Sequence, residues 1–559
     1  MLRWLLMNKR ILIFLAFIVI VASILRLWEL GKVPSSPDWD EVALGYNAYS
    51  IMQTGRDEYG KFLPIILRSF DDYKPALYMY LAMPSISFFG LSVFSVRLPS
   101  AIFGILTVIA TYFLARELFK DSRLKLEIPE VVSLLLAISP WHIQFSRVAF
   151  EANVGVALNV FGILFFLKAF KKSWFLFLSA LIFGLGFHVY QGEKVFVPFL
   201  LIVLIAVFRK QFFLIKKQYI VVSFLIIVII SLPLIQFILT NKNALARARD
   251  VSVFSNISLI ELNAAKILQD KKNNDFIGLM FDNRRIEFMK NTAAGYLSHF
   301  DFNWLFIKGD IARHHAPGMG LMYLIELPFF LMGIYNLIFG KFNKEAKIFT
   351  ILWLLIAPIP ASITNDVPNS VRTLSFLPIL QILTAIGIIS ASQKMSNFKF
   401  QILNFKIRYL IFSLCFLFFV FNFIYYLNQY FVQQNYFHAR YWQYGYENIV
   451  NYVATVQKDY KKIIVSNTAT MDQSYMFFLF YLKYDPHKYL SEGGTLTGKI
   501  EGKNRFANFE FKKFNYYEEN ENNILLIGSP FDLPEVFKTI HEVNFPDKSL
   551  AIKIVEKNK

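Results

Sequence analysis

Long apolar runs separated by short polar segments dominate the first three quarters of this chain. Runs of about 18 or more residues recur, alongside several shorter ones, and such a length can cross the roughly 30 Å hydrocarbon core of a bilayer. No small-residue cleavage site follows the first run, so we expect it to remain as a helix. The pattern predicts an α-helical polytopic membrane protein with about eleven transmembrane helices, at residues 11–28, 97–115, 129–145, 153–170, 174–190, 195–208, 218–239, 320–339, 348–364, 373–391 and 409–427.

One further apolar run, residues 75–90, does not fit this count. It is short and holds Pro84 in its interior, and as a span it would move the basic segment 115–125 to the outer side. We interpret it as an interfacial or re-entrant helix on the outer face. An ordinary short span is the alternative.

Lys and Arg residues set the predicted orientation. With a cytoplasmic N-terminus, every short inner segment carries three or four of them, as the positive-inside rule requires. The outer regions are then a loop at residues 29–96, a long loop at 240–319 and the C-terminal tail. The inner segments are the N-terminal tail and residues 116–127, 168–172, 209–217, 341–347 and 394–408.

The C-terminal tail differs from the rest in its pattern. "KKIIVSN", "NFEFKKF", "NILLIGSP" and "LAIKIVEK" are typical of strands, and helical patterns occur near residues 445–457 and 473–484. We predict a transmembrane domain at 1–431 and a small exterior α/β domain at 432–559.

Composition agrees with a membrane protein. Of 559 residues, 55% are hydrophobic and only 18% are charged, whereas soluble proteins carry about 25% charged residues. The net charge of +18 follows from the inner loops, and no aromatic-basic module indicates nucleic acid. The single cysteine, Cys415, lies in an apolar run, so no intrachain disulfide can form.

The first candidate catalytic residues lie in "SSPDWDEVALGYNAY", residues 35–49, where Asp38, Asp40 and Glu41 follow the first span. A hydrated polar loop is the plain interpretation. However, a carboxylate can act as a general base, and cations can stabilise a departing phosphate. Such cations recur on the predicted outer face: Arg56, Lys74, Arg147, Lys194, Arg247, Arg249 and Arg372. Together they suggest group transfer from a lipid phosphate, without identifying the group.

Several segments then match a known superfamily. "WDEVALGYNAYSI", "YKPALYMYL" and "SVRLPSAIFGILTVIATYFLARELF" resemble the C-type-fold membrane glycosyltransferases, especially the protein O-mannosyltransferase-like and aminoarabinose-transferase-like enzymes. "ISPWHIQFSRVAFEANV", "RHHAPGMGLMYLIELPFFLMGI" and "IAPIPASITNDVPNSVRTLSFLPIL" are similar to its bacterial branch. The order of these segments carries the resemblance, because no single motif is diagnostic.

The resemblance implies roles for matching residues. The Asp-Glu pair of the first outer loop corresponds to Asp40, as the residue acting on the acceptor, and Glu41, as its support; Asp38 is left as a solvated loop residue. Lys74 and Arg372 match residues that face the donor phosphate. Glu151 matches a second acid, for acceptor binding or support of Lys74. Related chains often carry a His three residues before the Arg, where this chain has Asn369.

Other candidates have plainer alternatives. Tyr190 and Lys194 either contact the donor or anchor the interface. Arg247 and Arg249 share a face if their stretch is extended, and would grip phosphate or line a solvated loop. Arg147 is a further substrate-binding candidate. Five histidines complete the set: His299, His314 and His315, whose spacing is not a recognised zinc signature, and His142 and His188, expected to pack or hydrogen-bond near helix ends.

We therefore predict an integral plasma-membrane glycosyltransferase that moves a sugar from a polyprenyl-phosphate donor to an acceptor hydroxyl on the exterior face, with inversion. No cofactor is required, no metal is assigned, and nucleic acid is not a partner; the acceptor is a protein, lipid or glycan. A lipid or glycan transporter or flippase is the main alternative, although it would place ionisable residues near mid-membrane. A glycan ligase or polymerase is another.

Overall fold

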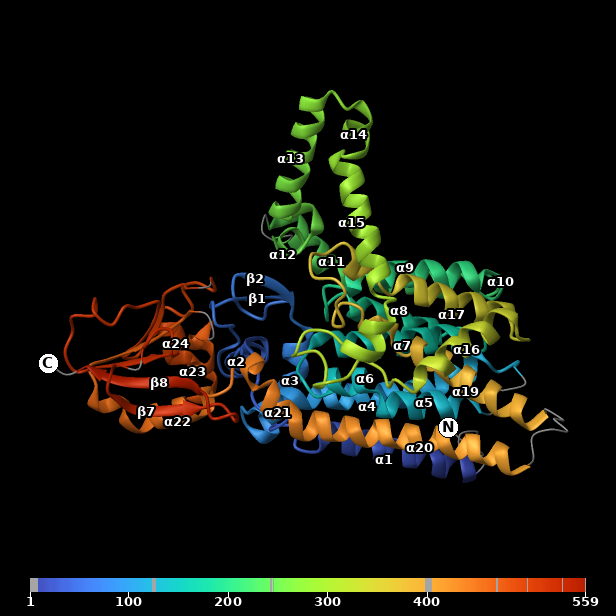
Figure 1. The fold of residues 1–559 in the computed structure, drawn as a ribbon, viewed down its shortest axis with the longest axis horizontal. Helices are drawn as coiled ribbons and strands as arrows, with labels where there is room; N and C mark the ends of the chain where they lie inside the picture. The colour runs from blue at the N-terminus through green and yellow to red at the C-terminus, as the bar shows by residue number, and fades with distance from the viewer. Residues whose placement is uncertain are drawn as a thin grey trace. The chain divides into compact units, whose positions relative to one another are not determined.

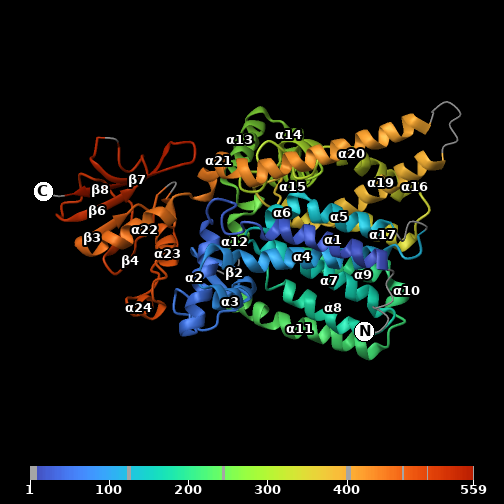
Figure 2. The same ribbon diagram turned by 90° about the horizontal axis from the view of Figure 1, so that it is seen from below.

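The computed structural model describes residues 9–122, 127–241, 244, 246–397, 405–468, 471–499, 501–534 and 536–557 (Figures 1 and 2). The chain forms two compact units, each assembled from separate stretches of sequence. The helical unit comprises residues 1–22, 105–143 and 152–423, and the mixed unit comprises residues 23–104, 144–151 and 424–559. Helices α1 (Lys9–Leu27), α4 (Val93–Leu118) and α20 (Phe405–Asn428) contribute residues to both units.

Each predicted span overlaps at least one helix. In the described part of the chain, six helices are long and apolar enough to cross a bilayer, a bent pair makes a seventh, and four shorter apolar helices accompany them. Their backbone groups bond within each helix, as a hydrocarbon environment requires. The other helices of the spanning region are α5 (Ile128–Ile138), α6 (Pro140–Ser146), α7 (Glu151–Ala169), α8 (Phe175–Gly186), α9 (Glu193–Val207), α10 (Arg209–Phe212), α11 (Lys217–Thr240), α16 (Glu326–Phe339), α17 (Lys344–Ile356), α18 (Ile359–Ser362) and α19 (Ile379–Asn397).

The predicted span at residues 129–145 is not one straight helix. It is the pair α5 and α6, bent by 57° at Ser139. Pro140 follows the bend, and its ring removes a backbone donor and clashes with the preceding turn. The continuous apolar pattern hid this break.

Helices α16 and α19 approach each other at two glycines. A Cβ atom on Gly333 would lie 1.8 Å from the Leu383 carbonyl oxygen, and one on Gly387 would lie 1.8 Å from that of Phe329. Small residues allow such backbone contact between helices in a membrane. Any larger residue at either position would push the two helices apart.

The long loop predicted at residues 240–319 is largely helical. It contains α12 (Ala246–Asp250), α13 (Ile257–Asn273), α14 (Phe276–Phe281) and α15 (Arg284–Ser298). In Figure 1, α13 and α15 run side by side as an arm joined at its tip by α14, away from the other helices of the helical unit. We call α13, α14 and α15 the arm.

After the end of α1, the mixed unit continues with α2 (Trp39–Thr54), which contains Asp40 and Glu41 of the predicted acid cluster and is capped by Asp38. A two-stranded antiparallel sheet follows, β1 (Ile66–Ser69) and β2 (Asp72–Pro75), and then α3 (Leu77–Phe89). Helix α3 is the apolar segment predicted at residues 75–90. Its 13 residues with Pro84 inside are too few to span a bilayer upright.

The C-terminal part of the mixed unit is built on a six-stranded sheet in the order β4-β5-β3-β6-β8-β7. The four predicted strands are confirmed, as are the two predicted helices. Ile464, Leu526 and Val555 lie in a buried cluster beneath the sheet. The strands are β3 (Lys462–Val465), β4 (Asn504–Phe506), β5 (Phe509–Phe511), β6 (Ile524–Gly528), β7 (Thr539–Asn544) and β8 (Leu550–Lys557), and the helices are α21 (Gln434–Phe437), α22 (Tyr446–Val456), α23 (Ser474–Tyr481) and α24 (Pro486–Ser491).

A buried carboxyl joins the end of the acid-cluster region to the C-terminal part of the mixed unit. Glu58 accepts hydrogen bonds from Thr495 Oγ1 at 2.6 Å, Tyr475 Oη at 3.1 Å and Asn47 Nδ2 at 3.0 Å. Burial raises the pKa of the Glu58 carboxyl to about 7, although the bonds from Thr495 and Asn47 act in the opposite direction. The carboxyl therefore gains a proton more readily in the folded protein than in the unfolded chain.

This raised pKa predicts a pH dependence of stability. Glu58 contributes most below the ordinary pKa of 4.5, and its contribution is lost as the pH rises through about 7, because the unfolded chain releases the proton first. We expect up to about 3 kcal/mol to depend on Glu58 across this window. Thermal unfolding of wild type and Glu58→Gln from pH 4 to 8 checks this prediction. The difference in the free energy of unfolding between the two proteins must change across the window. A difference that stays constant would refute the assignment.

Candidate functional site

The first turn of α2 is fixed by Asp38 and Glu41. Asp38 Oδ1 accepts the Glu41 N–H at 3.0 Å, and Glu41 Oε2 accepts the Asp38 N–H at 3.2 Å, which is a capping box. Asp38 is buried, so the prediction of a solvated loop residue is wrong. The Asp-x-x-Glu spacing before an apolar helix was the signal that sequence reasoning missed.

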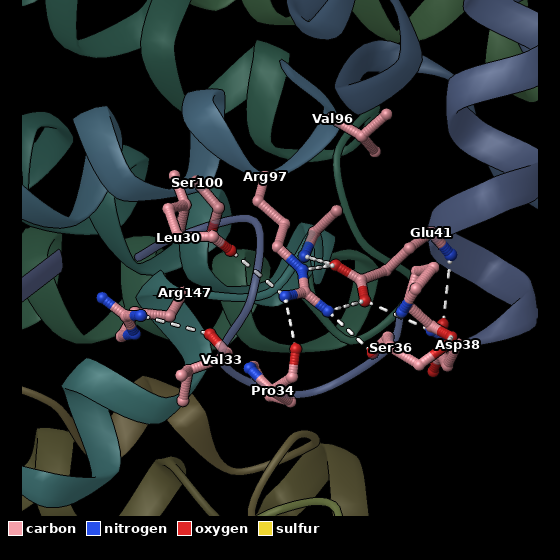
Figure 3. Close-up of polar contacts among 12 residues, drawn as sticks. Leu30, Val33, Pro34, Ser36, Asp38, Glu41, Val96, Arg97, Ser100 and Arg147 are labelled. Atoms are coloured by element: carbon pink, nitrogen blue, oxygen red, sulfur yellow. Dashed lines mark hydrogen bonds and ion pairs between the residues drawn. The ribbon is translucent and has the colours of Figure 1, made fainter. Parts of the chain in front are cut away.

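Glu41 also forms a fully buried ion pair with Arg97 (Figure 3). Arg97 Nε and Nη2 donate to the two carboxylate oxygens, each at 2.9 Å, and the Ala149 N–H donates to Oε1 at 2.8 Å. These contacts enclose Glu41 and leave it no exposed oxygen to offer a substrate. We therefore assign it to positioning α2 rather than to chemistry.

Arg97 uses all five of its N–H donors. The remaining three donate to backbone carbonyls of the segment before α2: those of Leu30 at 3.2 Å, Pro34 at 3.1 Å and Ser36 at 2.9 Å. Sequence reasoning did not single out Arg97. A charge in an apolar run is costly unless it has partners. The position of Arg97 at the start of such a run therefore indicated that it has buried partners.

Arg147 supports the same segment. It is fully buried, donates to the carbonyls of Leu25 at 3.0 Å and Val33 at 3.2 Å, and lies 4.7 Å from the centre of the Phe431 ring. Its prediction as a substrate-binding residue is corrected, because the enclosed guanidinium serves the backbone. Figure 3 shows Arg147 bonded to Val33, within the segment from Leu30 to Ser36 that Arg97 also holds.

Asp40 and Lys74 come together although 34 positions separate them. Lys74 lies on β2, paired with Leu67 of β1, and its Nζ forms an ion pair with Asp40 Oδ1. The Asp40 side chain is 27% exposed, unlike Asp38 and Glu41. Of the three clustered acids, Asp40 is thus the one that solvent and substrate can reach.

The helical unit contains a cavity with two of the predicted cations. Its volume is about 340 Å³, and Tyr190, Lys194, Ser252, Thr364 and Arg372 are among its lining residues. Lys194 Nζ donates to Gln191 Oε1 at 2.5 Å, and Arg372 Nη1 donates to Thr364 Oγ1 at 2.5 Å. Two fixed cations and two hydroxyls suit an anion with several oxygens, such as a phosphate.

Hydrogen bonds hold the loop that carries Arg372 at two neighbouring residues, Asn369 and Ser370. Asn369 Oδ1 accepts the Arg372 N–H at 3.0 Å, and the Asn369 N–H donates to His299 Nε2 at 3.2 Å. Burial lowers the pKa of His299 to about 4, so this ring is neutral and can accept. Asn369 therefore links α15 to the loop that carries Arg372.

Asp310 holds the same loop through Ser370. Its Oδ2 accepts from Ser370 Oγ at 2.6 Å, the Ser370 N–H at 2.8 Å and His314 Nδ1 at 2.9 Å. Burial acts to raise the pKa of Asp310, but the hydrogen bonds from His314 and Ser370 hold it at about 2. Sequence reasoning missed Asp310, and it named His314 only within a histidine group to which no metal was assigned. Among the described residues no three His, Cys, Asp or Glu side chains come together to hold one.

The remaining candidates lie elsewhere. Arg247 and Arg249 belong to α12, so this stretch is helical and the expected extended backbone is corrected. Arg249 is exposed, and Glu151 begins α7 half-buried. The packing expected for two histidines is confirmed: His188 Nε2 bonds to the Ile230 carbonyl at 2.8 Å, and His142 is buried.

Part of the chain matches a known protein family by sequence. Residues 73–236 match the family model for dolichyl-phosphate-mannose-protein mannosyltransferase. This stretch begins beside Lys74 and ends within α11. No curated protein matches the chain by sequence.

Two solved structures are similar over most of the chain. ArnT from Cupriavidus metallidurans bound to undecaprenyl phosphate has a TM-score of 0.53, with 10% identity and 98% of each chain covered. The chain has the C-type glycosyltransferase fold. The archaeal oligosaccharyltransferase AglB from Archaeoglobus fulgidus, in complex with an inhibitory peptide and a dolichol-phosphate, has a TM-score of 0.51 and 12% identity, over 93% of this chain and 69% of AglB.

A third structure is matched over less of its length. The chain spans 63% of the Archaeoglobus fulgidus oligosaccharyltransferase tethered with an acceptor peptide, with 13% identity and a TM-score of 0.49. The predicted C-type fold is confirmed by ArnT and AglB. The family model and the glycosyltransferase fold also agree with the predicted enzyme class, the transfer of a sugar.

Proposed function

We propose that this chain transfers a sugar from a polyprenyl-phosphate donor to an acceptor hydroxyl at the exterior face of a membrane. The cavity lined by Lys194 and Arg372 carries the proposal, because it offers two cations to a phosphate. The fold supports a lipid carrier, since the similar ArnT is bound to undecaprenyl phosphate and AglB to a dolichol-phosphate.

The donor is held by its phosphate in this account. Arg372 presents a planar guanidinium, which donates to Thr364 and forms an ion pair with the exposed Asp366 at 3.3 Å, and Lys194 adds a point charge. Both stabilise negative charge that develops on the phosphate as it leaves. With its charge neutralised, the lipid phosphate needs no strong general acid.

The acceptor is activated by Asp40. Its carboxylate takes the proton of the acceptor hydroxyl, the freed oxygen forms a bond to the anomeric carbon, and the bond between that carbon and the phosphate oxygen breaks. The electron pair departs with the lipid phosphate. Lys74, paired with Asp40, orients the carboxylate and adds positive charge. One displacement inverts the anomeric configuration.

Donor binding gives the direct test. Arg372→Ala and Lys194→Ala should each weaken the binding of undecaprenyl phosphate to purified protein by roughly 10- to 100-fold, since each removes a charge-assisted hydrogen-bond donor. Arg209→Ala removes an exposed charge from the same unit and serves as the matched control. Binding measured in detergent that is equal in all four proteins would remove the cavity from the mechanism.

A further inference from the structure

The arm exposes nine large apolar side chains. At its tip, α14 has the sequence Phe-Ile-Gly-Leu-Met-Phe, and Phe276 and Ile277 are 82% and 72% exposed. Within the described residues these side chains have no core to enter. A contiguous exposed apolar patch marks an interaction surface. The large exposed apolar residues of the arm are Ile257, Leu262, Leu268, Phe276, Ile277, Met280, Phe281, Met289 and Leu297.

Basic residues flank this tip on both sides. Lys271 and Lys272 lie in the last turn of α13, and Arg284 and Arg285 begin α15. All four are exposed. An apolar segment bordered by Lys and Arg is the pattern of structures that lie in the interface of a bilayer, where the cations meet anionic headgroups.

The place of the arm in the helical unit agrees with such a position. The arm follows the end of α11 and precedes the start of α16, so it leaves the helices where two of them reach a membrane face. In Figure 1 it runs across the axes of α16 and α17 rather than along them. Figure 2, turned by 90°, shows the arm foreshortened, as that direction requires. A pair of helices with this direction lies along the bilayer surface.

A largely apolar cavity runs along α15. Its volume is about 740 Å³, and it extends from Arg285, near the tip, to Tyr296 and Leu297, near the base. Most of its lining is apolar, whereas Arg285, Thr292 and Ser362 add polar groups. A lipid matches both features, because its acyl chain can contact the apolar side chains and its headgroup can meet the guanidinium.

We propose that the arm lies in the headgroup region of the bilayer, with α14 inserted among the acyl chains and the four flanking cations on anionic headgroups. The occupant of this apolar surface is the lipid of the membrane that the chain spans. This inference does not depend on the proposed sugar transfer, since it concerns only how the helical unit meets lipid.

The single cysteine allows a direct measurement. In a Cys415→Ser background, Ile277→Cys labelled with the fluorophore NBD is reconstituted in vesicles of phosphatidylcholine and phosphatidylglycerol. Phe531→Cys is the matched control, because Phe531 is 84% exposed in the C-terminal part. We expect NBD at 277 to emit at shorter wavelength, to be quenched by nitroxide-bearing lipids, and to be several-fold less sensitive to iodide than NBD at 531.

The opposite pattern overturns the proposal: equal iodide quenching at 277 and 531, with no effect of nitroxide lipids, places the tip in water. Phe281→Cys repeats the measurement at the end of α14 if labelling at 277 disturbs folding, judged by circular dichroism. Changing Lys271, Lys272, Arg284 and Arg285 together to Gln should raise iodide quenching at 277 several-fold in the same vesicles. Unchanged quenching would refute the role of the cations.

Discussion

Replacing Asp40 with Asn should reduce sugar transfer by roughly 10²- to 10⁴-fold while the protein still folds and binds donor. The amide keeps the size of the carboxylate but cannot take a proton from the acceptor hydroxyl. The ion pair with Lys74 is also lost, but the Asp40 side chain is 27% exposed, so we expect a stability change of no more than about 1 kcal/mol.

Two controls separate chemistry from folding for Asp40→Asn. Glu29→Gln removes a more exposed acid of the same unit and should leave transfer unchanged. Undecaprenyl phosphate binding to Asp40→Asn should match wild type, because the cavity with Arg372 is intact. A transfer rate within a few-fold of wild type would remove Asp40 from the role of base.

Replacing Arg97 with Met should be the most destabilising single change at the site, at about 3–5 kcal/mol. Methionine fills the space but leaves the Glu41 carboxylate buried with its main partner gone, and three backbone carbonyls lose their donors. Transfer should fall as well, since α2 then loses the ties that orient Asp40. Thermal unfolding in detergent, together with the rate, measures both effects.

The matched control for Arg97→Met is Arg440→Met. Arg440 pairs with Asp547 at 2.7 Å in the same unit, but its side chain is 56% exposed, so its loss should cost no more than about 1 kcal/mol. Adding Glu41→Gln to Arg97→Met should recover part of the loss, because it removes the unpaired buried charge. Equal destabilisation by the two Arg variants would show that the buried pair is not what holds α2.

Hydrophobic length and strand patterns carried most of the fold prediction. The apolar runs and the segments around β3, β5, β6 and β8 dictate their structure locally, so the sequence was sufficient for them. β4 has only three residues and β7 mixes polar with apolar positions, so neither shows a strand pattern. The arm was missed because polar residues interrupt its helices, and the bend at Ser139 because apolarity continues through it.

The structure brings two of the candidate residues together. Asp40 and Lys74 were named from sequence, and the structure pairs them. Glu41 and Arg147 were misjudged because a charge beside a membrane resembles a binding group whether it faces substrate or backbone, and only tertiary contacts distinguish the two. Asp310 and His299 form hydrogen bonds to the Arg372 loop from about 60 or more residues away in the sequence. A local sequence pattern cannot predict such contacts.

The central claim is that this chain moves a sugar from a lipid phosphate to an acceptor. Mass spectrometry of glycolipids, glycoproteins and envelope glycans, from cells producing either wild type or Asp40→Asn at equal membrane levels, tests it most directly. We predict a sugar-bearing acceptor that requires wild type, and accumulation of the polyprenyl-phosphate sugar with the variant. Identical spectra from the two cell lines, with neither a lost product nor an accumulated donor, would contradict the account.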